Sequence, residues 1–181
     1  MPHISIISSG QKTGRHSHRV ALYFKNYLKE TNLATAEILD LNNYNFPTFT
    51  EGGTSDEKPT AQAVEFAEKV KLSDGVIIVT PEHEGGFPPS LKNVINLFTK
   101  QWHRKPIATS TISSGVLSGS QGIASLQFLL WKIGAWTVPA PFRIPKVQQA
   151  FDESGNAHNK IETNKQADVF IKQLFWYIEA N

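Results

Sequence analysis

Three loops rich in glycine, serine and proline contain most of the residues in this 181-residue chain that could hold a small ligand. The first loop, residues 9–18, contains Ser9, Arg15 and Ser17 and leads directly into a predicted helix. N–H groups at the start of a helix, together with hydroxyl groups and cations, suit a phosphate group. The spacing therefore predicts a phosphate site; the alternative is a plain turn in which Ser17 caps the helix.

The second loop follows the most apolar strand and reads Pro81-Glu82-His83-Glu84-Gly85-Gly86-Phe87-Pro88-Pro89. Its two adjacent glycines allow the backbone to approach a ligand closely and to offer N–H donors. A flat heterocycle could accept hydrogen bonds there while His83 or Phe87 covers one of its faces. A histidine between two glutamates also suggests a metal ion. Neighbouring side chains in a tight loop rarely converge on one ion, however, so we expect no metal.

The third loop, residues 113–121, begins Ser113-Ser114-Gly115 and ends at another predicted helix. Its residues are small, and on this evidence alone a flexible surface loop remains open. None of the three loops contains a recognisable acid–base dyad or nucleophilic triad. The sequence therefore identifies binding residues but no catalytic side chain.

The elements that must position these loops are short β-branched runs alternating with stretches of helical periodicity. Strands are predicted at residues 4–8, 36–41, 75–80, 106–112 and 136–138, and helices at 18–30, 60–72, 90–99, 122–133 and 160–179. This alternation predicts a three-layer α/β sandwich with a five-stranded parallel sheet. Because no Gly-x-Gly-x-x-Gly follows the first strand, we favour the strand order 2-1-3-4-5, with the ligand beyond the carboxyl ends of the central strands. Segments 42–58 and 140–160 read as irregular parts of one domain, residues 1–181.

The formal net charge of +2 conceals an uneven distribution of charges. Residues 1–29 contain five cations and residues 85–151 contain seven, and neither stretch contains a carboxylate. Residues 30–84 contain eleven carboxylates. A fold that joins the two acid-free stretches would attract an anionic ligand. Nucleic acid is not expected, since the cations are not clustered and no nucleic-acid motif is present.

Cysteine is absent, which excludes a disulfide scaffold, a thiolate metal site and a cysteine nucleophile, and fits a reducing compartment. The amino-terminal residues lack the pattern of a signal peptide, and no apolar run approaches the ~20 residues of a membrane span. We therefore expect a cytoplasmic protein with no membrane contact.

The second loop and the helix after it resemble the signature of the NADPH-dependent FMN reductase family, Pro-Glu-Tyr-Asn-x-Ser-x-Pro-x-x-Leu-Lys-Asn. The matching residues are Pro81, Glu82, Pro88, Leu91, Lys92 and Asn93. The first and third loops are similar to the family's phosphate loop and its Ser/Thr-Gly-Gly loop. The chain departs from the signature at His83, Glu84 and Gly86, where the family has tyrosine, asparagine and serine.

The resemblance implies a flavodoxin-like fold and an FMN-dependent oxidoreductase. Electrons would pass from NADPH or NADH to a flavin, quinone, azo compound or similar small acceptor. The cofactor supplies this chemistry, so no catalytic side chain is implied. The FMN-binding residues implied are Ser9, Arg15, Ser17, Pro81, Glu82, His83, Glu84, Gly85, Ser113, Ser114 and Gly115. A homodimer or homotetramer is also implied, with the aromatic segments 98–102 and 128–136 as candidate interface surface.

Two other functions remain open from the sequence. One is a flavodoxin-like electron carrier that docks to protein partners, although such carriers usually have an acidic surface and this chain has a net charge of +2. The other is a protein of the same fold that has lost FMN through the changes at His83 and Glu84 and acts as an interaction module.

Overall fold

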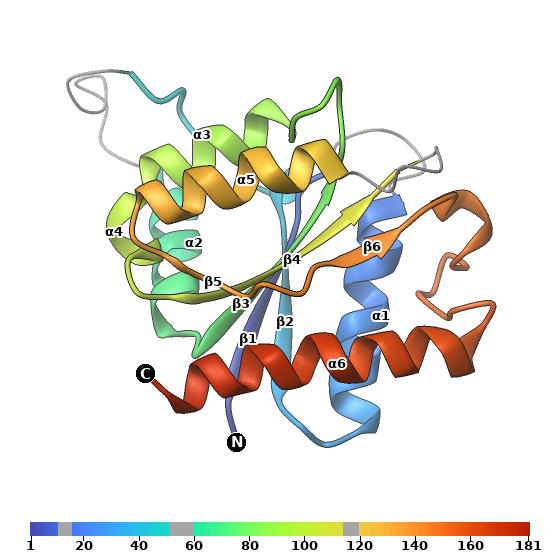
Figure 1. Cartoon of the computed structure of the whole chain (residues 1–181). Coiled ribbons are helices and arrows are strands. Elements are labelled where there is room, and N and C mark those ends of the chain that lie inside the picture. The colour runs from blue at the N-terminus through green and yellow to red at the C-terminus, as the bar shows by residue number, and fades with distance from the viewer. Residues whose placement is uncertain (11–15, 51–59, 114–119) are drawn as a thin grey trace.

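A parallel β-sheet forms the centre of the molecule in the computed structural model, which describes residues 1–10, 16–50, 60–113 and 120–181. Its main strands are β1 (His3–Ser8), β2 (Thr35–Asp40), β3 (Gly75–Pro81), β4 (Pro106–Ile112) and β5 (Trp136–Thr137). They lie in the order β2-β1-β3-β4-β5 (Figure 1), which confirms the predicted order. All the pairings are parallel, so every strand ends at the same edge of the sheet.

A sixth strand, β6 (Phe142–Ile144), lies in the segment that the sequence suggested was irregular, and that prediction was wrong here. β5 pairs with the beginning of β4, and β6 pairs with its end. Pro139 and Pro141 stand between the two short strands. Proline has no N–H to donate to a strand ladder, which explains why this edge is built from two pieces.

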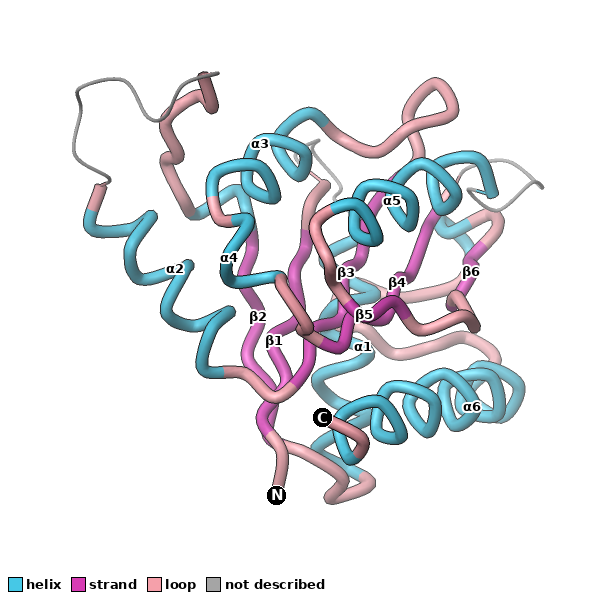
Figure 2. The backbone as a smooth tube through the Cα atoms, turned by 60° about the vertical axis from the view of Figure 1, so that its left-hand side comes forward, coloured by secondary structure: helices cyan, strands magenta, loops and turns pink. Residues whose placement is uncertain are grey.

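Helices cover both faces of the sheet, as the sequence predicted (Figures 1 and 2). One face is covered by α1 (His16–Glu30) and α6 (Lys160–Glu179). The opposite face is covered by α2 (Ala61–Leu72), α3 (Pro89–Leu97), α4 (Thr99–Trp102) and α5 (Ser120–Lys132). The described residues also form two short 3₁₀ helices, η1 (Leu41–Asn43) and η2 (Val147–Gln149). None of the helices in the described ranges is both long and apolar enough to span a membrane.

Alternate residues of the strands point into two separate cores. On the α1/α6 side, Ile6 and Val79 pack in a core with a cluster of aromatic rings around Phe24. On the other side, Ile78 packs in a core that includes Phe66 and Trp102. The sequence offered the aromatic segment 98–102 as candidate interface surface, but its Trp102 side chain is fully buried in the core and cannot contribute to an outer surface. Burial on both faces explains why the central strands are uninterrupted apolar runs.

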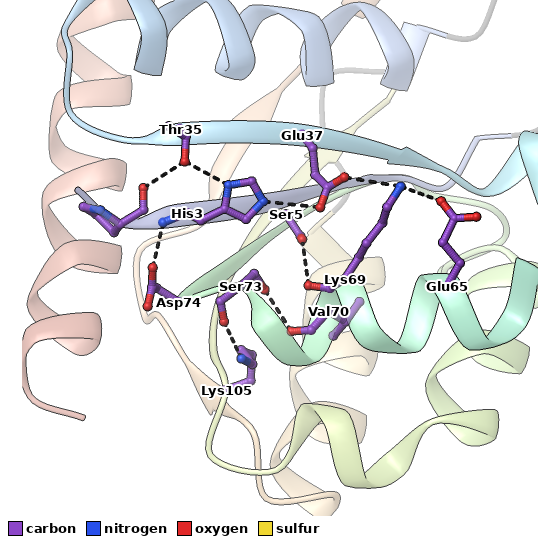
Figure 3. Close-up of polar contacts among 11 residues, drawn as sticks. His3, Ser5, Thr35, Glu37, Glu65, Lys69, Val70, Ser73, Asp74 and Lys105 are labelled. Atoms are coloured by element: carbon purple, nitrogen blue, oxygen red, sulfur yellow. Dashed lines mark hydrogen bonds and ion pairs between the residues drawn. The ribbon is translucent and has the colours of Figure 1, made fainter.

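A polar network holds the amino end of the sheet, away from the three loops (Figure 3). The His3 ring lies 2.9 Å from Thr35 Oγ1 through Nδ1 and 3.3 Å from Glu37 Oε1 through Nε2. Lys69 Nζ of α2 pairs with Glu37 at 3.4 Å and with Glu65 at 2.7 Å. The hydrogen bond with Glu65 is the main reason why the pKa of Lys69 is raised. These pairs fix α2 to β1 and β2.

The turn that precedes α6 depends on Gly155, and this generates a stability prediction. Gly155 has φ +83°, and a Cβ there would lie 2.6 Å from the backbone nitrogen of Tyr23 on α1. We expect Gly155→Ala to lower the free energy of unfolding by about 1–3 kcal/mol, measured by urea denaturation. Gly86→Ala is the matched control, because its Cβ would lie at an ordinary 3.6 Å from the His83 carbonyl oxygen. Equal losses in the two variants would contradict the prediction.

Candidate functional site

The three loops singled out in the sequence begin side by side at the carboxyl edge of the sheet. The backbone N–H of Ser9 donates to the carbonyl of Val79 at 3.1 Å, which joins the end of β1 to β3. The N–H of Glu82 donates to the carbonyl of Ile112 at 3.2 Å, which joins the end of β3 to β4. The N–H of Ser113 then donates to β6 at 3.1 Å. The parallel strands therefore bring the described starts of all three loops together.

The beginning of α1 packs closely against the residues after β1, through a contact between Gly10 and Ser17. Ser17 is the second residue of α1 and is only 1% exposed, and its Oγ accepts the N–H of Gly10 at 3.2 Å. A Cβ on Gly10 would lie 2.2 Å from that oxygen, so only glycine permits this approach. No described residue accepts the proton of this hydroxyl, so the proton can be donated to a ligand. Gly10 also lies against Pro81, with 3.8 Å between its Cβ position and Pro81 Cδ.

The first turn of α1 is electrostatically suited to an anion. It contains no carboxylate that would compete for the partial positive charge at the helix start. Burial, reinforced by the positive charge of Arg19, lowers the pKa of His16. Arg19 itself points to the turn before α6, where it donates to the Phe151 carbonyl oxygen at 3.4 Å. Arg15, the cation that the sequence assigned to phosphate, lies outside the described residues.

The second loop is a two-residue hairpin. His83 and Gly86 exchange both backbone hydrogen bonds, at 2.9 and 2.8 Å. Glu84 and Gly85 between them have φ values of 48° and 75°, the conformation of a type I′ turn. The N–H groups of His83 and Gly86 are therefore used within the turn. Among the described residues, the N–H groups of Glu84 and Gly85 have no partner in the fold, and this turn can offer both as donors to a ligand.

Glu82 joins the second loop to the start of α5. Its Oε2 accepts the N–H of Gly122 at 2.8 Å. The Gln121 side chain approaches Gly85, with 2.8 Å between Oε1 and the Cβ position of that glycine. The carboxylate of Glu82 thus accepts an N–H group at the start of α5, where a negative charge stabilises the helix. The sequence contains no signal for this contact, because the two residues are forty positions apart.

Asn93, from the segment that resembles a family signature, has a structural role that the sequence did not reveal. Its Oδ1 accepts the N–H of Phe49 at 2.7 Å, and its Nδ2 donates to the carbonyl of Pro47 at 2.9 Å. Leu91, two residues earlier, is fully buried in the core on this face. The two side chains together fix the segment after η1 to α3.

The third loop is held at its first residue. Ser113 donates its N–H to Ile144, and its carbonyl accepts the N–H of Val147 at 3.2 Å. This fixes the end of β4 to the end of β6. Ser114 and Gly115, the other two predicted site residues here, lie outside the described residues. Across the described parts of the chain, no three histidine or carboxylate side chains gather as metal ligands.

Comparison with known proteins identifies the family. The family description "NADPH-dependent FMN reductase" matches residues 2–149. The chain belongs to this family. The match confirms the resemblance found in the sequence and, with it, the predicted class, an NAD(P)H-dependent oxidoreductase with FMN as its cofactor.

Individual relatives agree with this assignment. The subunit CrdA of the NADH:(hydroxy)cinnamate reductase of Vibrio ruber is 26% identical over 175 residues, which is 93% of this chain and 82% of that protein. A quinone reductase of Pseudomonas putida is 32% identical over 132 residues, 69% of each chain. The solved structure of FerB from Paracoccus denitrificans superposes with a TM-score of 0.81 at 16% identity, covering 99% of this chain and 98% of that one. The predicted flavodoxin-like fold is therefore confirmed.

The described residues fit FMN. The close approach of Gly10 to Ser17, the buried Ser17 hydroxyl and the carboxylate-free start of α1 suit its phosphate. The unused N–H groups of Glu84 and Gly85 suit the polar edge of its ring system. FMN, when bound, supplies the chemistry of electron transfer. The part left to this chain is to orient the cofactor and to place donors and positive potential around it.

The turn conformation predicts the effect of restoring the family's asparagine. Glu84 holds a left-handed φ that asparagine tolerates better, and Asn-Gly is a preferred type I′ pair. We expect Glu84→Asn to raise the free energy of unfolding by about 0.5–1 kcal/mol in urea denaturation. Glu84→Gln removes the same charge without the conformational benefit and should give no gain. A gain of the same size in both variants would instead mean that the charge was responsible.

Proposed function

We propose that this protein passes electrons from NADPH or NADH, by way of bound FMN, to a small acceptor such as a quinone, a flavin or an azo compound. The observation that carries the proposal is the set of hydrogen-bond donors at one edge of the sheet: the hydroxyl of Ser17 and the N–H groups of Glu84 and Gly85. The names of the relatives, a hydroxycinnamate reductase and a quinone reductase, support a small unsaturated acceptor.

Each loop has a proposed part in holding FMN. Ser9, Arg15 and Ser17 belong to the phosphate end, where the carboxylate-free helix start attracts the anion. The remaining residues border the ring system: Pro81, Glu82, His83, Glu84, Gly85, Ser113, Ser114 and Gly115. Within this second group, Glu82 acts indirectly, because its carboxylate is bound to the start of α5. His83 and Glu84 are exposed, so the backbone of this turn, rather than its side chains, offers the fixed contacts.

The test of this function begins with purified protein saturated with FMN. We expect a flavin absorbance spectrum and continuous consumption of NADPH or NADH with a quinone and no other protein. A protein that binds FMN but needs a protein partner for turnover would be an electron carrier. A protein that stays colourless with FMN would be an interaction module.

The phosphate assignment has its own test. Arg15→Ala should weaken FMN binding by about 1.5–3 kcal/mol, the range for a charge-assisted hydrogen bond. Lys100→Ala, which removes an exposed cation on α4, is the control and should leave the FMN dissociation constant unchanged. An unchanged constant in the Arg15 variant would remove this residue from the site.

The assembly we propose is a homodimer formed through the outer face of α5. Phe128 and Trp131 are 61% and 66% exposed, and their ring centroids lie 5.8 Å apart. Lys132 lies within about 6 Å of both rings. Two large adjacent aromatic side chains on a surface favour a protein contact. The same helix begins beside the second loop, so a partner on this face would lie near the flavin.

Light scattering tests this interface. We expect a dimeric mass for the natural protein and a monomeric mass for the double variant Phe128→Asp/Trp131→Asp, because buried carboxylates oppose association. Val169→Asp, at an exposed apolar position of α6, should leave the dimer intact. A natural protein that is monomeric at micromolar concentration would overturn the proposal, and a tetramer would require a second interface.

Residues 1–181 are proposed to act as one domain, since both cores share a single sheet. The absence of cysteine supports a cytoplasmic location.

A further inference from the structure

The hairpin turn 83–86 packs closely against the start of α5, and a glycine of that helix lies at the contact. Gly122 is buried and is the third residue of α5. A Cβ on Gly122 would lie 3.1 Å from the carbonyl oxygen of Gly86 and 3.3 Å from Cγ of Glu82. Both distances are shorter than the favourable separation of about 3.5–4.0 Å between non-bonded atoms. The turn can therefore lie where it does because Gly122 has no side chain.

Glu82 adds a directional contact at the same place. Its Oε2 accepts the N–H of Gly122 at 2.8 Å, a distance typical of a good N–H···O hydrogen bond. The backbone N–H of Glu82 donates to the carbonyl of Ile112 at the end of β4. Glu82 therefore holds the beginning of the turn from two directions, from the sheet through its backbone and from α5 through its side chain.

The position of the turn determines where the N–H donors of Glu84 and Gly85 lie. His83 and Gly86 exchange both backbone hydrogen bonds, so the turn moves as one unit. The Gln121 side chain of α5 lies against it, with its Cβ 3.8 Å from the Cβ position of Gly85. A displacement of the turn from α5 changes the direction of both donors together, and hydrogen bonds weaken steeply when they are poorly aligned.

We infer that Glu82 and Gly122 are positioning residues for the flavin ring, because they set the place from which the N–H groups of Glu84 and Gly85 reach its polar edge. Both residues act through the turn and need not touch the flavin. The inference rests on the proposed binding of FMN at this edge of the sheet. The rival explanation is that their contact only stabilises the start of α5.

Gly122→Ala distinguishes the two explanations, because alanine forms helices better than glycine. If the contact served only α5, the variant would keep its stability to urea and its affinity for flavins. The added methyl group, however, forces the Gly86 carbonyl to move by a few tenths of an ångström. We expect the apoprotein of this variant to bind both FMN and riboflavin about tenfold more weakly, measured by quenching of flavin fluorescence, since the two flavins share the ring. Unchanged affinity for both, or a loss confined to FMN, would overturn the inference.

Variants of Glu82 give an independent test in case Gly122→Ala folds poorly. Glu82→Ala removes the acceptor and should weaken both flavins about tenfold, whereas Glu82→Gln keeps an oxygen that can accept the same N–H and should lose less than about threefold. The matched control is Thr60→Ala, since Thr60 Oγ1 accepts the N–H of Ala63 at 3.1 Å at the start of α2. This control should lose stability but keep both dissociation constants. Equal losses of affinity in Glu82→Ala and Glu82→Gln, or in Glu82→Ala and Thr60→Ala, would overturn the inference.

The midpoint potential of the bound flavin is a readout that a purely structural contact would not change. A reduced flavin is richer in electrons than the oxidised form, so N–H donors at its polar edge favour the reduced form. Glu82→Ala should therefore weaken the reduced flavin about tenfold more than the oxidised flavin, which lowers the potential by about 30 mV for a two-electron couple. Thr60→Ala should leave the potential unchanged.

The outcomes separate this inference from the proposed function. If the natural protein binds FMN and consumes NADPH or NADH with a quinone, but Glu82→Ala and Gly122→Ala change neither affinity nor potential, only the inference is wrong. If the natural protein binds neither flavin, the proposed function is wrong and the inference is wrong with it.

Discussion

The common direction of β1, β3 and β4 is the constraint on which the candidate site depends. Parallel strands need long crossovers, and each crossover starts at the carboxyl edge of the sheet. The loops after these three strands therefore meet although they are far apart in the sequence, and single backbone hydrogen bonds from Ser9, Glu82 and Ser113 join each loop start to its neighbour. No side chain has to be placed precisely for this edge to form. The edge forms because helices pack against both apolar faces of the same strands and bury them.

The distribution of carboxylates gives this edge its electrostatic character. The segment 30–84 is rich in acids, and those among the described residues lie in different parts of the fold. Glu37 and Glu65 lie with Lys69 at the amino end. Of the acids near the carboxyl edge, Glu82 is bound to the start of α5 and Asp40 is paired with His18. Because the first turn of α1 itself contains no carboxylate, the helix start beside Ser17 remains favourable to an anion.

The sequence was sufficient to predict the layers, the strand order and which loops begin at the carboxyl edge of the sheet. Strongly apolar runs such as residues 75–80 have only one stable location, the middle of a sheet covered on both sides. It was not sufficient for β6, because three residues between proline-rich segments give too short a pattern. Contacts such as Glu82 with Gly122, or His18 with Asp40, join residues that are far apart in the sequence and that no sequence motif pairs. Only the folded chain determines such pairs, since they depend on register and helix rotation rather than on periodicity.

The sequence was also not sufficient to predict the role of the residues at which the chain differs from its family signature. From the sequence, a glutamate at position 84 would oppose an anionic ligand nearby unless its side chain pointed to solvent. In the structure, Glu84 occupies the first central position of a type I′ turn and is exposed to solvent. Water screens a charge in such a position strongly, so its effect on a bound anion is small. The cost of the departure is then chiefly conformational, because glutamate holds a left-handed φ less readily than asparagine. The N–H groups of Glu84 and Gly85 belong to the backbone of this turn, and they keep their places whether glutamate or asparagine stands at position 84.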